Sequence, residues 1–255
     1  MNYYELIRSV ARQLMQSRKS AATGGSTTTL VDSNLDAPND FYNGGLLFID
    51  QTIPVIKKIT DWNSTTFTFT FATGTAVAAS TVYTVVDERY PLDVIKNSIN
   101  QALIEDVGAI MLYDESLTPV DEQERYDLPG GVVDVRRIEI GTEDEGWNIN
   151  YQWKIEGGQI RFYDNLPTEE DTIRIHYVSQ HPELEDLDDD LDNSLNVDMI
   201  IHAACVYAIN WRITKVREGE PELRDKLSYH ETKAMFAKSR MGNRLLNPDP
   251  FHTRY

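Results

Sequence analysis

The densest group of possible metal ligands lies at residues 182–198, PELEDLDDDLDNSLNVD, with eight carboxylates in seventeen positions. The first, third and fifth positions of an EF-hand calcium loop are matched by Asp186, Asp188 and Asp190. Such a loop also needs a glycine sixth and a bidentate glutamate twelfth, where this chain has Leu191 and Val197. The spacing therefore does not predict a calcium site.

A structural role explains this segment, which we call the acidic joint, better than metal binding does. Its leucines recur at intervals that can pin it to a core: Leu184, Leu187, Leu191 and Leu195. Its carboxylates precede a helix expected from about Val197, so they face the positive end of that helix's dipole. Asn196 or Ser194 can cap the helix. We expect a solvated joint anchored by its leucines.

Other motifs that could carry catalysis are incomplete. His230-Glu231 begins an H-E-x-x-H zinc motif, but Ala234 stands where the second histidine is required. The sequence contains no Walker loop, G-x-G-x-x-G fingerprint or G-x-S-x-G elbow. The single cysteine, Cys205, excludes an internal disulfide and a multi-cysteine zinc site. We therefore expect no enzyme, no catalytic residue, no cofactor and no bound metal.

The formal charge of −17 is unevenly distributed, because both ends of the chain are net basic while the middle is strongly acidic. An acidic body repels a phosphate backbone, so tight nucleic-acid binding is not expected. The basic ends favour contact with acidic surfaces, such as those of sister subunits. The first residues lack the apolar core of a signal peptide, and no run of about eighteen apolar residues predicts a membrane span. We expect a cytoplasmic protein.

Apolar periodicity predicts four helices. Residues 2–18 carry one apolar stripe, and Pro91 opens a second helix that Gly108 ends. Two more helices close the chain, separated by Gly219 and Pro221. On the last of them, His230 belongs to the apolar face.

Two segments between the helices have residue patterns that predict β structure. In the first, five short strands are predicted: TTTLV, GGLLFID, PVIKKIT, TTFTFTFA and STVYTVV. Phe67, Phe69 and Phe71 alternate with threonines, so they are expected to face a core. In the second, four strands are predicted: GVVDVRRIEI, WNINYQWKIE, QIRFY and TIRIHYV, with a hairpin turn at Gly157-Gly158.

The predicted fold class is α+β, a four-helix core with an inserted small antiparallel β-barrel or sandwich and a second antiparallel β-sheet. Residues 1–22 and 88–107 form the N-terminal part of the helical core, and 23–87 the inserted β module. Residues 108–181 form the second sheet. Residues 182–241 form the acidic joint and two core helices, and 242–255 an extended docking tail.

Two passages carry a resemblance to a known family. TTTLVDSNLDAPNDFYNGGLLFI followed by IKKITDWNSTTFTFT resembles the β insertion of adaptor, or head-tail connector, proteins of tailed bacteriophages. TIRIHYVSQHPELEDLDDDLDNSLNVDMIIHAACVYAINWRI is similar to the strand, acidic joint and alanine-containing helix of those proteins. The resemblance implies a virion protein of the neck, assembled in the host cytoplasm. It implies a ring, commonly of twelve subunits, beneath the portal of the DNA-filled head, with a docking surface for the next tail protein.

In such proteins a C-terminal segment commonly reaches the portal, and here the positions after Met241 are available for that contact. Pro248 and Pro250 forbid a helix that would bury the apolar residues of this segment together. The predicted portal interface comprises Lys238, Arg240, Arg244, Leu245, Leu246, Pro248, Pro250, Phe251 and Tyr255. An alternative is a phage baseplate or tail-fibre component that binds a partner or a sugar through its β module.

Overall fold

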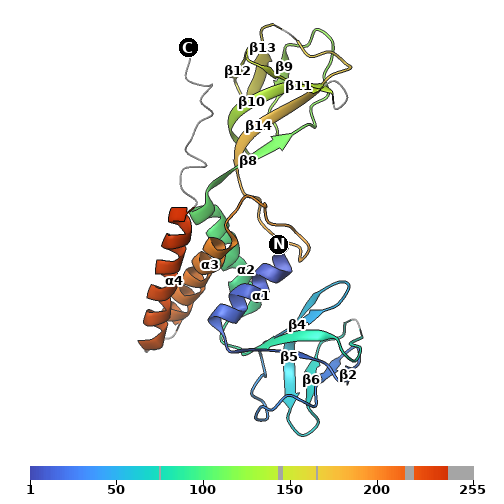
Figure 1. Cartoon of the computed structure of the whole chain (residues 1–255), viewed down its shortest axis with the longest axis vertical. Helices are drawn as coiled ribbons and strands as arrows, with labels where there is room; N and C mark the ends of the chain where they lie inside the picture. Colours follow the sequence, from blue (N-terminus) through green and yellow to red (C-terminus); the bar gives the residue numbers. More distant parts are fainter. Residues whose placement is uncertain (75, 143–145, 165, 216–220, 241–255) are drawn as a thin grey trace. The chain divides into compact units, whose positions relative to one another are not determined.

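The computed structural model describes residues 1–74, 76–142, 146–164, 166–215 and 221–240. The chain forms two compact units (Figure 1). The second unit, Val107–Pro182, is inserted into the first, which contains Met1–Asp106 and the chain from Glu183 onward.

The predicted fold class is wrong. Over the described residues the chain is mostly antiparallel sheet, with fourteen strands in three sheets and four α-helices, instead of a four-helix core with a small inserted barrel. The helices are α1 (Tyr3–Leu14), α2 (Leu92–Ala102), α3 (Val197–Lys215) and α4 (Pro221–Arg240), and α2 continues into a π-helical turn, η1 (Leu103–Val107).

The first sheet has seven strands in the order β1-β7-β4-β5-β6-β3-β2. Their bounds are β1 Ser17–Ala21, β2 Gly24–Gly25, β3 Thr29–Val31, β4 Leu46–Asp50, β5 Val55–Asn63, β6 Thr68–Phe71 and β7 Val82–Val86. The sheet is larger than predicted because the first helix ends at Leu14 and the next residues pair along β7, with Ser17 opposite Val86. The apolar stripe of α1 stops at Leu14, so the polar residues beyond it gain nothing from helix packing.

Aromatic side chains fill the interior of this sheet. The Trp62 and Phe69 rings lie 4.4 Å apart, and the Tyr42 ring lies 5.6 Å from that of Phe69. Phe71 is buried as predicted, but Phe67 is 37% exposed and has a φ of 52°, since it ends a turn before β6 begins. Two of the three predicted phenylalanines therefore face the core.

Strands β4 and β7 are buried on both faces. Leu47 and Ile49 of β4 belong to the core of the seven-stranded sheet, whereas Phe48 is fully buried on the opposite face. There the Phe48 ring meets that of Tyr4 of α1 edge-on, with centroids 6.0 Å apart. The Tyr4 hydroxyl donates to Asp50 Oδ1 at 2.8 Å, and Arg8 Nη1 lies 2.6 Å from the same oxygen. One strand thus joins the sheet core to the first helix.

The second unit contains two sheets that share a core. A four-stranded sheet has the order β11-β10-β14-β8, and a three-stranded sheet has the order β12-β13-β9. The bounds are β8 Ala109–Asp114, β9 Arg125–Asp127, β10 Val132–Thr142, β11 Gly146–Asn150, β12 Trp153–Glu156, β13 Gln159–Phe162 and β14 Thr172–Gln180. The core between them holds Tyr126, Val135, Ile138, Ile160, Phe162, Ile173, Ile175 and Tyr177.

The segment WNINYQWKIE, predicted as one strand, is divided between the two sheets. The chain turns after Asn150, whose Oδ1 accepts from the Gln152 N–H at 2.7 Å, and the Trp153 Nε1–H donates to the Asn150 carbonyl at 3.0 Å. The alternation of apolar residues continues through this turn, which is why periodicity did not reveal it. The predicted hairpin at Gly157-Gly158 is confirmed between β12 and β13, with φ values of 62° and 83°.

We predict that the helices and the seven-stranded sheet of the first unit melt together. Because Phe48 lies on the helix side of a strand whose other face is the sheet core, Phe48→Ala should lower the free energy of unfolding by about 3–5 kcal/mol. Calorimetry and near-ultraviolet circular dichroism should show one shifted transition for this unit. Phe67→Ala, at a partly exposed turn, is the control and should change stability by less than about 1 kcal/mol. Separate melting of helices and sheet would contradict the prediction.

Candidate functional site

The described part of the predicted portal interface is the last turn of α4. Lys238 and Arg240 both lie there, where cations suit the negative end of the helix dipole. The other predicted residues lie outside the described residues: Arg244, Leu245, Leu246, Pro248, Pro250, Phe251 and Tyr255. The structure therefore brings together two of the nine residues on one helical turn.

The end of α4 is tied to η1 and α3 through two carboxylates. Lys238 Nζ lies 3.6 Å from Asp106 Oδ1. The Tyr207 hydroxyl of α3 lies 3.0 Å from Asp106 Oδ2 and 3.0 Å from Glu105 Oε2. Burial and the hydrogen bonds to these carboxylates raise the pKa of Tyr207, so its hydroxyl remains a donor. The position at which the C-terminal segment leaves α4 is thus fixed by three elements.

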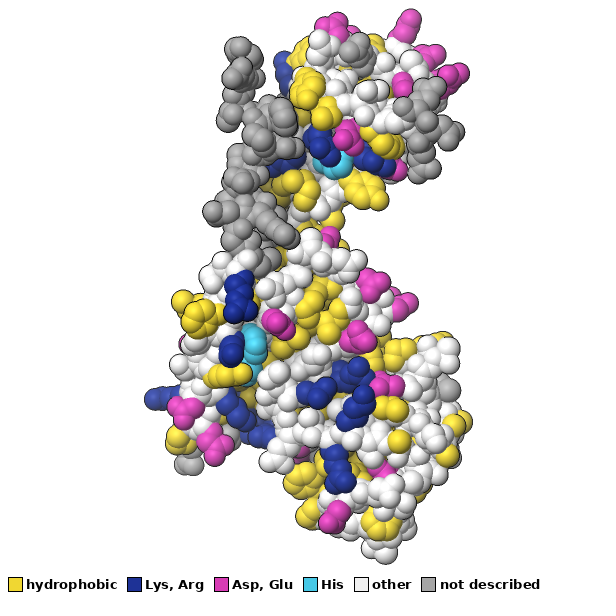
Figure 2. Space-filling view, in the orientation of Figure 1, with side chains coloured by type: hydrophobic (Ala, Val, Ile, Leu, Met, Phe, Trp, Pro, Cys, Tyr) yellow, Lys and Arg dark blue, Asp and Glu magenta, His cyan; other side chains and the backbone are white. Residues whose placement is uncertain are grey.

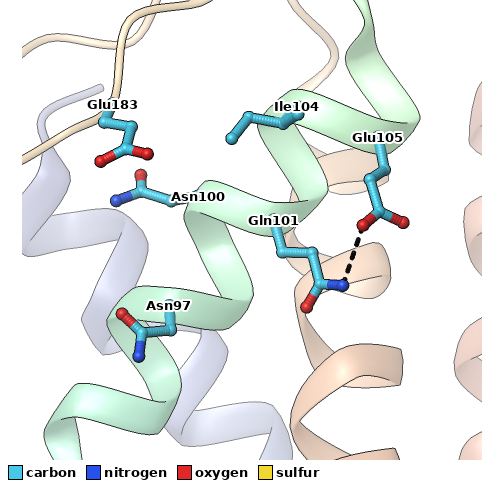
Figure 3. Close-up of a pocket in the computed structure, with 6 residues that line it drawn as sticks. All are labelled: Asn97, Asn100, Gln101, Ile104, Glu105 and Glu183. Atoms are coloured by element: carbon cyan, nitrogen blue, oxygen red, sulfur yellow. Dashed lines mark hydrogen bonds between the residues drawn. The ribbon is translucent and has the colours of Figure 1, made fainter.

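A pocket of about 320 Å³ lies on α2 and η1 (Figure 3). It is lined by Asn97, Asn100, Gln101, Ile104, Glu105 and Glu183. Gln101 Nε2 donates to Glu105 Oε1 at 3.0 Å, and this bond, followed by that from Tyr207, lowers the pKa of the Glu105 carboxyl. Side chains of these two kinds, amides and carboxylates, can bind polar or cationic groups.

The acidic joint is attached to α1 and α2 as a structural segment. Asn100 donates through Nδ2 to the Leu184 carbonyl and accepts through Oδ1 from the Leu184 N–H, both at 3.1 Å. The carbonyls of Leu187 and Asp189 accept from the Tyr4 and Tyr3 N–H groups, at 3.0 and 2.8 Å. The joint thus satisfies amide donors in the first turn of α1, which have no partner within the helix.

Anchoring of the joint by its leucines is confirmed for three of the four, since Leu184, Leu191 and Leu195 are buried. Leu187 is half-buried. Asn196 caps α3 as predicted, because its Oδ1 accepts from the Met199 N–H at 3.2 Å. Among the described residues, no group of three or more His, Cys, Asp or Glu side chains is placed to hold a metal ion.

Buried His230 and half-buried His202 form a pair that the sequence did not reveal. His202 Nδ1 of α3 lies 2.9 Å from His230 Nδ1 of α4. Burial, with the proximity of His202 and of Lys226, lowers the pKa of His230 to about 4. Burial also lowers the pKa of His202. The nearby Asp198 raises this pKa, whereas the positive charge of Lys233 lowers it. The contact between the two rings joins α3 to α4.

Two further buried groups are also structural. The Asp32 carboxylate, in the core of the seven-stranded sheet, accepts from Ser20 Oγ at 2.5 Å and from the Tyr83 hydroxyl at 2.7 Å. Burial alone would raise the pKa of Asp32, but these hydrogen bonds outweigh it and lower the pKa. Burial raises the pKa of the Cys205 thiol, which makes this thiol a poor nucleophile.

Comparison of the sequence with models of protein families gives one match. The family model described as SU10 adaptor protein matches residues 1–249. No curated protein matches the chain. Within the described part of the chain, no helix has both the length and the apolar character that a bilayer crossing requires.

We predict that the histidine pair makes stability fall in acid. Unfolded histidine binds a proton below about pH 6.5, whereas folded His230 does so only near pH 4. The unfolded state therefore binds more protons in this window, and stability should be lost as the pH falls through it, by on the order of 2–3 kcal/mol. The readout is the free energy of unfolding in urea at several pH values.

His230→Gln, compared with the unchanged chain, isolates this contribution. Carboxylate titration is common to both proteins and cancels in the difference between them. The stability difference measured at pH 8 should shrink between pH 6.5 and 4. A constant difference across that range would contradict the prediction.

Proposed function

Because the chain belongs to the SU10 adaptor protein family, we propose that this phage structural adaptor forms a ring of twelve subunits beneath the portal. In this position it joins the DNA-filled head to the tail and lines the DNA channel. The portal protein, the next tail or neck protein and sister subunits are its partners. The neck of the virion is its location after assembly in the host cytoplasm.

The observation that carries this proposal is the fixed origin of the C-terminal segment. Lys238 is held beside Asp106, and Tyr207 holds both Asp106 and Glu105, so α4 ends at a defined place in the first unit. The segment that follows, GNRLLNPDPFHTRY, combines apolar side chains, cations and prolines and is too short to build a core of its own. A segment of this composition with a fixed origin is suited to docking on another protein.

The charge of the chain supports a position around DNA. Asp and Glu side chains are scattered over the visible face of both units (Figure 2), and the formal net charge is −17. A ring of such subunits repels the phosphate backbone from the channel wall, so that the genome slides without adhering. Repulsion between subunits also opposes assembly, and salt should weaken that repulsion.

We propose that the docking segment binds a groove of the portal. Leu245, Leu246, Phe251 and Tyr255 supply the apolar anchors, and Lys238, Arg240 and Arg244 meet acidic groups at the rim. Buried aromatic anchors usually carry most of the energy of such an interface, whereas rim charges mainly change the association rate and its salt dependence.

We predict that truncation after Met241 separates docking from folding. The melting temperature should change by no more than about 1–2 °C, because the two sheet cores lie within residues 22–85 and 126–177. Assembly onto isolated portal should be lost in a pull-down and in sedimentation.

Two full-length variants give the matched comparison. Phe251→Ala with Tyr255→Ala should weaken portal binding by about 100-fold or more. Arg240→Ala with Arg244→Ala should mainly slow association and reduce its dependence on salt. Full-affinity assembly of the truncated chain would show that another surface binds the portal. Electron microscopy of the assembly separates a ring from the trimer expected of a tail fibre.

A further inference from the structure

The outer edges of the three sheets differ in how they are protected against pairing with another chain. Edge strands are commonly protected by Lys, Arg or Pro, or by being very short. Four of the six edges have such protection. Strand β1 carries Arg18 and Lys19, β2 has two residues, β9 has three, and β12 carries Lys154.

The two remaining edges belong to the same sheet. Strand β8, AIMLYD, and strand β11, GWNIN, contain neither a basic residue nor a proline. Within the described residues β8 pairs only with β14, and β11 pairs only with β10. The four-stranded sheet of the second unit therefore has two edges that lack these protecting residues.

The face of this sheet that points away from its core is apolar at both edges. Met111 and Tyr113 of β8 are 50% and 64% exposed, and Ile149 of β11 is 41% exposed. The visible face of this unit also shows hydrophobic side chains beside histidine and cationic side chains (Figure 2). Contiguous exposed apolar residues beside an unprotected edge are the features of a pairing site.

The centre of the same face is held rigid by ionic and aromatic contacts. The Glu139 carboxylate, on a side chain that is nearly buried, lies 2.9 Å from His176 Nε2 and 3.2 Å from Arg137 Nε. The Arg174 guanidinium lies over the Trp147 ring, 3.7 Å from its centroid. The two edges are therefore presented by a fixed platform, which lowers the entropy cost of binding.

The strand directions make the two edges complementary in a head-to-tail repeat. Each neighbouring pair in the sheet is antiparallel, and the number of strands is four, so β8 and β11 run in opposite directions. When a second copy follows in the same orientation, its β8 lies antiparallel to β11 of the first. Such a contact uses different surfaces on the two copies, and repeats of this kind close into rings or extend into filaments.

We propose that β11 of each subunit pairs with β8 of a second copy, so that the four-stranded sheets join edge to edge around the assembly. The occupant of each edge is thus another copy of this chain. Main-chain hydrogen bonds supply the pairing, and Met111, Tyr113 and Ile149 form the apolar contact across the junction. This inference rests on the proposed ring.

Cysteine cross-linking tests the pairing in full-length protein assembled on portal. Two double variants cover two registers: Met111→Cys with Ile149→Cys, and Tyr113→Cys with Ile149→Cys. Facing residues of an antiparallel pair lie about 4.5–5.5 Å apart at Cα, which is within disulfide reach. Oxidation should give a ladder of covalent multimers on a non-reducing gel. Cys205 is fully buried and does not compete.

The single-cysteine variants are the matched controls, and they should give no species larger than a dimer.

A second comparison places positive charges on the β8 edge. Met111→Lys with Tyr113→Lys should reduce assembly at least tenfold while the chain still melts cooperatively. Ile155→Lys, at a 42% exposed position on the already basic strand β12, should assemble normally.

Each outcome separates this inference from the proposed function. Rings with a ladder support both. Rings without a ladder in either register, and unaffected by the lysines, overturn the edge pairing and leave the ring. A ladder on open filaments supports the pairing and overturns the ring, and the absence of both rings and ladder overturns both.

Discussion

Burial of β4 and β7 on both faces is the constraint on which the first unit depends. A strand that faces two cores must be apolar at successive positions, and LLFID and VYTVV are almost continuously so. Phe48 meets Tyr4 of α1 on one side, while Leu47 and Ile49 complete the aromatic interior on the other. The helices and the sheet therefore stabilise each other within one compact unit.

The sequence predicted elements better than it predicted their assembly. The alternation of TIRIHYV identified β14, and Pro221 correctly opened α4. The predicted fold class was wrong for two reasons. Residues after α1 form β1, which pairs with β7 and enlarges the first sheet. The turn after Asn150 places β11 and β12 in different sheets. Both differences depend on partners distant in sequence, which periodicity does not report.

The candidate site shows the same limit. Lys238 was recognised from its place at a helix end, but its neighbour Asp106 is 132 positions earlier and could not be inferred from spacing. His202 and His230 lie on separate helices, so their pairing required the packing of α3 on α4. The sequence gives one indication of this pairing: His230 lies on the apolar face of its helix, which is expected to pack inward. In the acidic joint, the Asp189 carboxylate accepts from the backbone N–H groups of Glu185 and Asp186.

The insertion of the second unit within the first has a mechanical consequence. The chain enters it after Asp106 and leaves it at Pro182, so two covalent connections join the units. A force that pulls the units apart is divided between both, whereas a domain added at a chain terminus transmits its whole load through one. A single proteolytic cut at either crossing also leaves the second unit attached. In a phage structural adaptor, this topology keeps the second unit attached to the first after a single break in either connection.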